Sequence, residues 1–167
     1  MTIILITGGA RSGKSVRAEA RALQFSGRPI YIATAEPFDA EMRTRIAVHR
    51  ARRTDIWDEL EVPLDLAAAL NQTDGKGVRL VDCLTLWLSN LMHANRDLAT
   101  TATELAATLE KQTSPVVLVT NEVGLGIVPD NALARAYRDA AGILNQTVAR
   151  MADEVEFIVA GLPMKIK

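Results

Sequence analysis

The stretch that decides the fold of this chain covers residues 3–15 and reads Ile3-Ile4-Leu5-Ile6-Thr7-Gly8-Gly9-Ala10-Arg11-Ser12-Gly13-Lys14-Ser15. Its first five residues are apolar or β-branched without interruption, which is typical of a strand covered on both faces of a parallel sheet. The next eight residues match the pattern G-x-x-x-x-G-K-[ST] in full. A helical pattern follows directly, so this stretch predicts a strand, a phosphate-binding loop and a helix in succession.

Each part of the loop has a physical reason. Glycines let the backbone curl so that successive N–H groups point inward and form an anion-binding nest, and the helix that opens at Lys14 adds its positive amino end. Lys14 can reach the β- and γ-phosphates, and the Ser15 hydroxyl can bind Mg²⁺. The loop therefore predicts a nucleoside triphosphate and Mg²⁺ as ligands. The nucleotide-binding residues expected here are Gly8, Gly9, Ala10, Arg11, Ser12, Gly13, Lys14 and Ser15.

Short apolar runs alternate with longer helical patterns along the rest of the chain. Strands are expected over 3–7, 29–34, 78–82, 116–120 and 155–160, and helices over 14–25, 41–53, 85–94, 103–112 and 130–151. In the first helix Val16, Ala20 and Leu23 share a face, and Asp130 is expected to cap the last helix. This alternation predicts an α/β fold with a mostly parallel sheet and helices on both faces. Ligands of such sheets bind at the carboxyl ends of the strands.

Composition limits the class of protein further. The chain has 167 residues, of which 49% are hydrophobic and 23% charged, so we expect one globular domain over residues 1–167. No apolar run approaches the roughly 18–20 residues of a membrane helix, and the first residues lack a signal peptide's basic region and cleavage site. We therefore expect a cytoplasmic protein without a membrane span. The single cysteine, Cys83, excludes a disulfide framework, and two histidines leave little room for a histidine-based metal site.

The charge distribution points to an anionic ligand. The net charge of −1 and an aromatic content of 4% argue against a nucleic-acid partner. Residues 1–53, however, have a net charge of +6, and the remaining residues have a net charge of −7. An anion is therefore expected to bind in the N-terminal third of the chain.

Two acidic residues compete for the role of supporting the metal ion. Enzymes with this loop usually supply a carboxylate at the end of a neighbouring strand. Asp82 ends the strand expected at 78–82, and Glu122 follows the strand expected at 116–120. For Asp82, an ordinary residue of a turn at the end of a strand is the alternative. The chain contains no N-K-x-D sequence, so the guanine-selecting element of GTPases is absent.

A basic segment follows the second expected strand. Residues 43–53 hold five of the fourteen arginines, and they form either a solvated helix face or phosphate contacts. His49 lies among them, and neighbouring cations favour its neutral form. A neutral imidazole can attack an α-phosphorus and carry a nucleotidyl group, although an ordinary helix residue is the alternative. His93 is expected to be a packing or surface residue.

The segment 120–129 leaves the fourth expected strand with polar residues and then interrupts an apolar stretch with Gly124 and Gly126. It is either a turn with left-handed glycines or a contact with substrate or another subunit. The residues themselves leave both interpretations open.

Four segments together resemble the bifunctional adenosylcobinamide kinase/adenosylcobinamide-phosphate guanylyltransferase family of cobalamin biosynthesis. The resemblance covers essentially the whole chain and rests on Ile6-Thr7-Gly8-Gly9-Ala10-Arg11-Ser12-Gly13-Lys14-Ser15, Tyr31-Ile32-Ala33-Thr34-Ala35, His49-Arg50-Ala51-Arg52-Arg53 followed by Trp57, and Val119-Thr120-Asn121-Glu122-Val123-Gly124-Leu125-Gly126-Ile127-Val128-Pro129. The last of these segments is the most specific.

The resemblance implies two reactions in a RecA-like P-loop fold. A nucleoside triphosphate phosphorylates adenosylcobinamide, and the phosphate product then receives GMP from GTP with release of pyrophosphate, giving adenosylcobinamide-GDP. ATP and GTP are the implied substrates, Mg²⁺ the cofactor, a homotrimer the assembly, and the guanylylated histidine matches His49. Besides the loop, the implied nucleotide contacts are Ala33, Thr34, Ala35, Arg50, Ala51, Arg52, Arg53, Glu61 and Asp82.

Two other functions compete with this interpretation. One is a simple P-loop kinase for a small alcohol, in which His49 takes no part. The other is a nucleotide-dependent switch that assembles with itself or a partner and has no acceptor. Labelling with α-labelled GTP separates the three, because only the guanylyltransferase forms a covalent histidine adduct.

Overall fold

A computed structural model of the chain describes residues 1–37, 40–52 and 55–167. Within the second helix, the side chains of Glu41, Met42, Arg45, His49 and Arg52 lie outside this description.

Among the described residues, one sheet of seven strands runs through the molecule in the order β3-β2-β4-β5-β1-β6-β7. Neighbouring strands are parallel except β6 and β7, which form an antiparallel hairpin. The strands are β1 (Ile3–Gly8), β2 (Ile30–Ala33), β3 (Asp58–Glu61), β4 (Arg79–Asp82), β5 (Val116–Val119), β6 (Glu154–Val159) and β7 (Leu162–Lys165). The mostly parallel sheet confirms the predicted α/β class.

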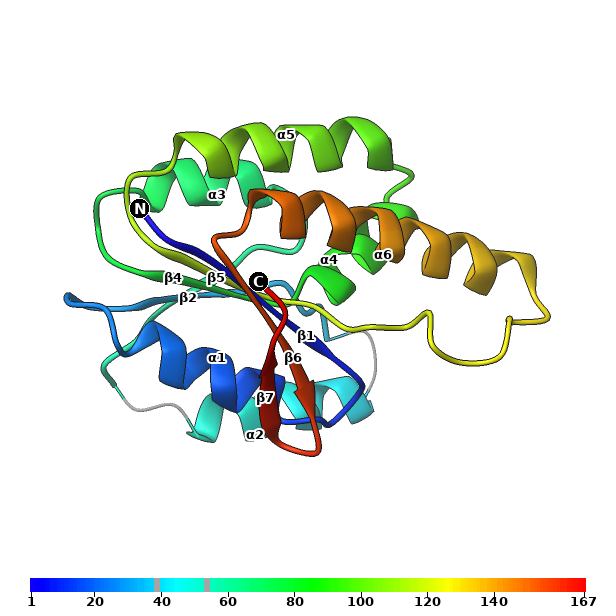
Figure 1. Cartoon of the computed structure of the whole chain (residues 1–167), viewed down its shortest axis with the longest axis horizontal. Helices are drawn as coiled ribbons and strands as arrows, with labels where there is room; N and C mark the ends of the chain where they lie inside the picture. Colours follow the sequence, from blue (N-terminus) through cyan, green and yellow to red (C-terminus); the bar gives the residue numbers. More distant parts are fainter. Residues whose placement is uncertain (38–39, 53–54) are drawn as a thin grey trace.

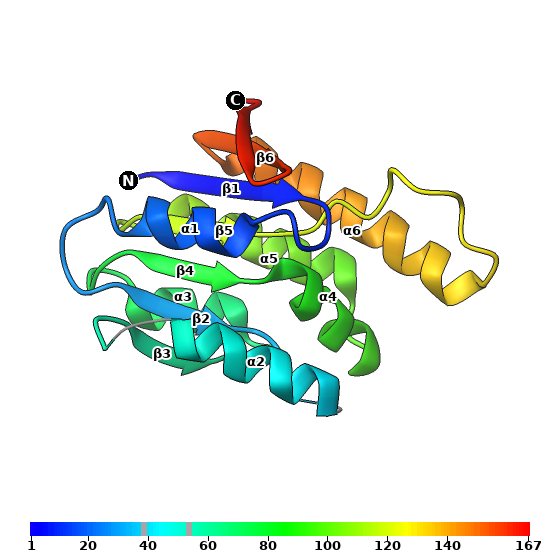
Figure 2. The ribbon, with the colours of Figure 1, turned by 90° about the horizontal axis from the view of Figure 1, so that it is seen from below.

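Helices cover both faces of this sheet (Figures 1 and 2). Helices α1 (Lys14–Ala22) and α2 (Ala40–Arg52) lie on one face. Helices α3 (Leu66–Thr73), α4 (Leu84–His93), α5 (Leu98–Lys111) and α6 (Ala132–Met151) lie on the other. Across the described residues, no helix combines the length and apolar character needed to cross a membrane.

The two faces have separate cores, because successive side chains of a strand point to opposite sides. On the α1 face, Ile4 and Ile6 of β1 pack in one buried cluster with Ala18 and Ala22 of α1. On the other face, Ile3 and Leu5 belong to a larger cluster that includes residues of α3, α4, α5 and α6. Burial on both sides explains why β1 and β5 are apolar throughout.

The five expected strands and five expected helices all occur, with shifted bounds. The predicted cap of the last helix is wrong, because Asn131 occupies that position and its side chain accepts a hydrogen bond from the Ala134 N–H at 2.7 Å. The face expected for α1 is also not the buried one. Lys14, Ala18 and Ala22 are buried there, whereas Val16 and Leu23 are exposed, because small residues let α1 lie close to the sheet.

Three elements were not expected, and α5 begins earlier than expected. Strand β3 is an acidic edge strand, Asp-Glu-Leu-Glu, and β7 contains Pro163, so neither shows the usual strand pattern. Helix α3 is only eight residues long. Helix α5 begins at Leu98 and not at 103, because the Asp97 side chain caps it by accepting from the N–H groups of Ala99 and Thr100.

A buried polar cluster closes the amino edge of the sheet. Arg79, at the start of β4, is fully buried and donates to Asp74 at 2.9 Å and to Gln112 at 2.6 Å. The carboxylate of Asp74 also accepts from the backbone N–H groups of Thr113 and Ser114. We call Asp74, Arg79, Gln112, Thr113 and Ser114 the amino-edge network.

Opposing effects set the Asp74 pKa. Partial burial alone would raise it, but the hydrogen bonds from Ser114, Thr113 and Arg79 hold the pKa of this carboxyl well below its usual range. Burial acts in the opposite sense on its partner and lowers the pKa of the Arg79 guanidinium. Asp74 is therefore more stable as a carboxylate in the folded chain than in the unfolded one.

Candidate nucleotide site

The loop between β1 and α1 has the backbone geometry of an anion nest. Gly8 has φ +145°, and a Cβ atom there would lie 2.5 Å from the carbonyl oxygen of Ile158 on β6. Gly13 has φ +101° and forms the N-cap of α1. Two positions of the sequence pattern are thus glycine because no side chain fits their conformation or surroundings.

Lys14 opens α1 and folds back over this loop. Its side chain is buried, and its Nζ atom donates a hydrogen bond to the Gly9 carbonyl at 2.5 Å. The Ser12 carbonyl accepts from the Gly161 N–H at 2.9 Å, which ties the loop to the β6–β7 hairpin. A cationic group is thereby held at the mouth of the nest, where an anion would bind.

Two hydroxyl groups at or next to the loop have no partner within the described part of the chain. The Oγ1 atom of Thr7 and the Oγ atom of Ser12 are buried, and neither has a hydrogen-bond partner among the described residues. Buried hydroxyls are normally satisfied. The Ser12 Oγ atom lies inside the loop, 3.1 Å from the position of a Cβ atom at Gly8, so it suits a ligand rich in acceptor oxygens, such as a phosphate chain, whereas alternation along β1 places Thr7 on the opposite face of the sheet with Ile3 and Leu5.

The parallel register aligns the other predicted residues at the same edge. Ala33, the last residue of β2, is opposite Glu61 of β3 and also opposite Asp82 of β4. Asp82 is opposite Val119 of β5, which in turn is opposite Ile6 of β1, two residues before the loop. Residues from four separate segments of the sequence therefore meet along the carboxyl edge of the sheet.

Asp82 lies on the α1 face of that edge. Its Oδ2 atom accepts a hydrogen bond from the Tyr31 hydroxyl at 2.8 Å, and Tyr31 belongs to the core cluster on the α1 side. Sequence reasoning missed Tyr31 as the residue that orients this carboxylate. Its position two residues before Ala33 on the same strand is the signal that could have identified it.

Thr34 joins two strand ends and is completely buried. Its hydroxyl donates to the Cys83 carbonyl at 2.7 Å and accepts from the Cys83 N–H at 2.8 Å. The Asn90 side chain donates to the Thr34 carbonyl at 2.7 Å. These contacts give Thr34 the role of fixing the ends of β2 and β4, with Ala33 and Ala35 partly exposed on either side. Burial raises the pKa of the Cys83 thiol to about 11, so this thiol stays protonated near neutral pH.

Arg50 links the basic helix to the acidic edge strand. Its guanidinium donates to Glu61 at 2.9 Å and to Glu59 at 2.8 Å, and hydrogen bonds to Glu61 and then Glu59 raise the pKa of Arg50. The carboxyl end of β3 and the last turn of α2 are thereby held together. Ala51 is exposed nearby. Of the other predicted residues, Arg53 and the side chains of His49 and Arg52 lie outside the described part of the structure.

Asp82 and Glu122, the two candidate acids, both lie at the carboxyl edge. They follow different strands, and these strands are not equally close to β1 in the sheet. Glu122 follows β5, which is directly beside β1, and its backbone N–H donates to the Gly8 carbonyl at 3.0 Å. Its side chain accepts from the Gly124 N–H at 2.5 Å. Asp82 ends β4, one strand further away. Among the described residues no group of three His, Cys, Asp or Glu side chains is arranged to hold a metal ion.

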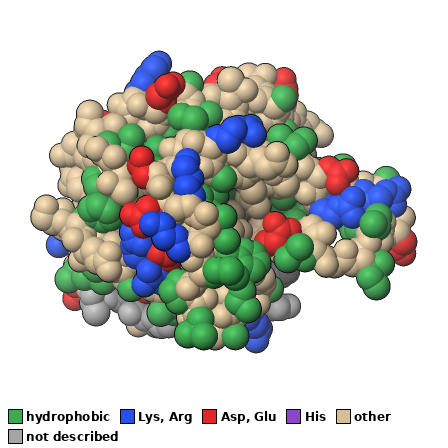
Figure 3. All heavy atoms as spheres, viewed as in Figure 1, with side chains coloured by type: hydrophobic (Ala, Val, Ile, Leu, Met, Phe, Trp, Pro, Cys, Tyr) green, Lys and Arg blue, Asp and Glu red, His purple; other side chains and the backbone are tan. Residues whose placement is uncertain are grey.

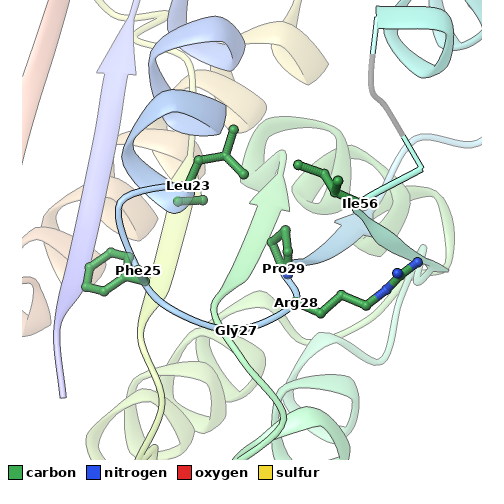
Figure 4. Close-up of a pocket in the computed structure, with 7 residues that line it drawn as sticks. Leu23, Phe25, Gly27, Arg28, Pro29 and Ile56 are labelled. Carbon is green, nitrogen blue, oxygen red and sulfur yellow. The ribbon is translucent and has the colours of Figure 1, made fainter.

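The pocket shown in Figure 4 lies apart from this edge. It has a volume of about 380 Å³ and is lined by the end of α1, by residues that lead into β2, and by Ile56 before β3. The amino ends of the strands open there, so the pocket is not part of the phosphate site. His93, predicted to be a packing or surface residue, is exposed.

The fold and the loop define a nucleotide-binding protein of the P-loop class. Two solved structures share this fold. The flagellar accessory protein FlaH from Methanocaldococcus jannaschii is 15% identical with a TM-score of 0.56, covering 99% of this chain and 78% of that chain. The P4 protein of bacteriophage φ6 in complex with ADP is 16% identical with a TM-score of 0.52, covering 97% and 52%.

Sequence comparison is more specific. The family model for cobinamide kinase / cobinamide phosphate guanyltransferase matches residues 4–166. The chain is 48% identical to the bifunctional adenosylcobalamin biosynthesis protein CobP of Pseudomonas aeruginosa, over 98% of this chain and 96% of the relative. It is 40% identical to the bifunctional adenosylcobalamin biosynthesis protein CobU of Escherichia coli, over 99% of each. The chain belongs to the cobinamide kinase / cobinamide phosphate guanyltransferase family, which confirms the predicted resemblance.

Proposed function

We propose that this protein phosphorylates adenosylcobinamide with a nucleoside triphosphate and then transfers GMP from GTP to adenosylcobinamide phosphate, releasing pyrophosphate. The observation that carries the proposal is the complete phosphate loop at the carboxyl edge, in a chain that matches the family from residue 4 to residue 166. Residues 1–167 act as one nucleotide-binding domain in this proposal. The proposal also includes a cytoplasmic location, because the proposed substrates of the protein are ATP and GTP.

The guanylyl transfer proceeds in two displacements. The neutral imidazole of His49 attacks the α-phosphorus of GTP, the nitrogen–phosphorus bond forms, and the bond to pyrophosphate breaks. A phosphate oxygen of adenosylcobinamide phosphate then attacks the same phosphorus and releases His49. His49 lies in the last turn of α2, one residue before Arg50, whose side chain reaches the carboxyl edge.

The residues around the phosphates have distinct roles in this proposal. Lys14 neutralises charge on the β- and γ-phosphates, and the N–H groups of residues 8–15 cradle them. Mg²⁺ bound at the site would be held by the Ser15 hydroxyl and supported by Asp82, and it would neutralise developing phosphate charge. Oxygen donors of this kind fit Mg²⁺, and Glu122 is the alternative acid. Arg50, Ala51, Arg52, Arg53, Glu61, Ala33, Thr34 and Ala35 complete the proposed nucleotide surroundings.

A labelling experiment tests the covalent step. Incubation with α-labelled GTP is expected to leave an acid-labile, base-stable label on the protein, and His49→Asn is expected to abolish it. His93→Asn is the matched control, because His93 is an exposed histidine on another helix. Unlabelled parent protein, or a labelled His49→Asn variant, would contradict the mechanism. Transfer from γ-labelled ATP to adenosylcobinamide tests the kinase step separately.

The proposed assembly is a homotrimer, and an exposed arm supports it. Residues 123–131 and the start of α6 stand out from the body (Figures 1 and 3). On this arm Ile127 is 98% exposed and Leu125 is 81% exposed. Clustered exposed apolar side chains mark association surfaces.

Light scattering tests the assembly. We expect a mass of about 54 kDa, three times the 18.1 kDa of one chain. Ile127→Asp is expected to shift the mass toward one chain. Leu162→Asp, at an exposed apolar residue of β7, is expected to leave it unchanged. The reverse pattern would place the interface on β7, and a monomeric parent would overturn the trimer.

A further inference from the structure

The segment that leaves β5 is held by side chains from two helices on the far face of the sheet. The Asn121 N–H donates to the Thr85 hydroxyl of α4 at 2.7 Å. The Asn121 carbonyl accepts from the Asn145 side-chain amide of α6 at 3.1 Å. Both backbone polar groups of Asn121 are therefore fixed by side chains from α4 and α6.

Asn145 has a second contact that fixes its own orientation. Its Oδ1 atom accepts from the Thr120 hydroxyl at 2.7 Å. The side-chain amide of Asn145 therefore accepts one hydrogen bond and donates another, and its partners are Thr120 and Asn121, the two residues that follow β5. Tyr137, about two turns before Asn145 on α6, donates its hydroxyl to the Thr85 carbonyl at 2.9 Å, so α4 and α6 are also joined to each other.

The next residue along the chain contacts the phosphate loop directly. The Glu122 N–H donates to the Gly8 carbonyl at 3.0 Å. Asn121 is therefore the neighbour in sequence of a residue that is hydrogen-bonded to the first glycine of the loop. Helices α4 and α6, which contribute no residue to the loop, are connected to it through this segment.

The alternation of side chains indicates which face Asn121 presents. Val119 packs in the core cluster on the α1 face, and Thr120 points to Asn145 on the opposite face. Continuing this alternation places the Asn121 side chain on the α1 face, where Lys14 and Asp82 lie. The carboxamide of Asn121 makes no hydrogen bond to any other part of the chain that the structure describes.

We propose that the carboxamide of Asn121 donates a hydrogen bond to the γ-phosphate of the bound nucleoside triphosphate, and that Asn145 is the positioning residue that fixes Asn121 for this contact. An amide N–H₂ group is a donor suited to a phosphate oxygen. Its backbone is held on both sides, so the donor is placed before the ligand arrives. This proposal deepens the proposed function, since it names a residue that distinguishes a triphosphate from a diphosphate.

Nucleotide binding tests this without relying on catalysis. Affinities for GDP and for a GTP analogue with a methylene bridge between its α- and β-phosphates, which His49 cannot cleave, are measured by titration on Asn121→Ala and on the parent protein. We expect the affinity for the triphosphate analogue to fall about tenfold to a hundredfold, as for a lost hydrogen bond to a charged group, while the affinity for GDP stays within about threefold. Equal losses for both nucleotides, or no loss for either, would overturn the contact.

A second set of variants tests the positioning role. Asn145→Asp keeps an acceptor for Thr120 but places an oxygen against the Asn121 carbonyl, so it is expected to reproduce the selective loss of triphosphate affinity. Gln146→Ala removes a neighbouring exposed amide of α6 and is expected to change neither affinity. The double variant Asn121→Ala/Asn145→Asp is expected to bind no more weakly than Asn121→Ala alone, because both act through one contact. Additive losses would show that Asn145 acts on the fold and not through Asn121.

The failure of this proposal is distinguishable from failure of the proposed function. If the parent protein binds both nucleotides but neither phosphorylates adenosylcobinamide nor forms a GMP adduct, the proposed function fails while the binding comparison still decides the role of Asn121. If the parent carries out both reactions and Asn121→Ala binds the triphosphate analogue normally, only the further inference fails.

Discussion

The two edges of the sheet bury polar groups in different ways. At the amino edge, Asp74 and Arg79 form hydrogen bonds with each other, with Gln112 and with the backbone of residues 113–114, and the Nε atom of Arg79 is the buried group of this cluster without a partner among the described residues. At the carboxyl edge, the loop leaves the buried hydroxyls of Thr7 and Ser12 without a partner among the described residues.

This difference separates stability from binding. Internal partners at the amino edge stabilise the fold, because breaking them leaves a buried charge or donor unpaired. Glycines and unpaired hydroxyls at the carboxyl edge stabilise little, but they present donors to an anion. Substitutions at the amino edge should therefore change the free energy of unfolding, and substitutions at the carboxyl edge should change nucleotide chemistry.

The largest expected effect is at Lys14. Lys14→Ala removes the cation at the mouth of the loop and is expected to lower the rate of both reactions by roughly 10²–10⁴. Steady-state assays with ATP and GTP measure this. Lys76→Ala, an exposed lysine near the amino edge, is the matched control and should leave both rates unchanged. Normal turnover by Lys14→Ala would mean that the loop is not catalytic.

Alanine substitutions at two glycines, one at each edge, allow a direct comparison of the two edges. A Cβ atom at Gly8 would contact the Ile158 carbonyl, and one at Gly77 would contact the Arg28 carbonyl, so alanine at either position is expected to lower the free energy of unfolding by about 1–3 kcal/mol. Only Gly8→Ala should also abolish nucleotide binding below the melting temperature. Loss of binding by folded Gly77→Ala would break the comparison.

Asp74 gives the amino edge a pH dependence. Because folding lowers its pKa below the ordinary value of about 3.9, its contribution to stability is fully present above that value and is lost as the pH falls from there through the lower pKa of the folded state. Asp74→Asn is expected to lower the free energy of unfolding by about 1–3 kcal/mol at pH 7. The difference from the parent protein should shrink below roughly pH 4.

Chemical denaturation over a pH series measures this dependence, with the exposed Asp139→Asn as control. Nucleotide affinity should be unchanged in both variants, because neither residue lies at the carboxyl edge. A difference that grows as the pH falls would contradict the assigned direction of the pKa shift.

The smallest expected effect on stability is at Arg50. Its ion pairs with Glu59 and Glu61 are solvent-exposed, so Arg50→Ala should change the free energy of unfolding by less than about 1 kcal/mol. GTP affinity, in contrast, is expected to fall, since the proposed site includes Arg50. Arg28→Ala breaks a similarly exposed pair with Asp58 before the amino end of β2 and should leave GTP affinity unchanged. Equal GTP affinities for the two variants would remove Arg50 from the site.

The amino-acid sequence was sufficient for the elements that have strong local signals. Continuous apolar runs identified β1 and β5, and the glycine–lysine pattern identified the loop, because the phosphate nest is formed by consecutive residues. Weak patterns failed: β3 is acidic, β7 contains Pro163, and the first turn of α5 is rich in threonine. Strands β3 and β7 form because they pair with β2 and β6 at the two edges of the sheet, and the first turn of α5 forms because the Asp97 side chain caps it.

The site divides in the same way. The sequence by itself determined the phosphate loop, the α/β class and the polar residues that follow the strands at the carboxyl edge, since these depend on short-range patterns. Only the tertiary structure decided that Glu61, Ala33 and Asp82 align across three strands, that Tyr31 orients Asp82, and that Thr85 and Asn145 hold Asn121. Such contacts join residues up to fifty-one positions apart in the chain, and strand order and register, which no local pattern specifies, bring them together.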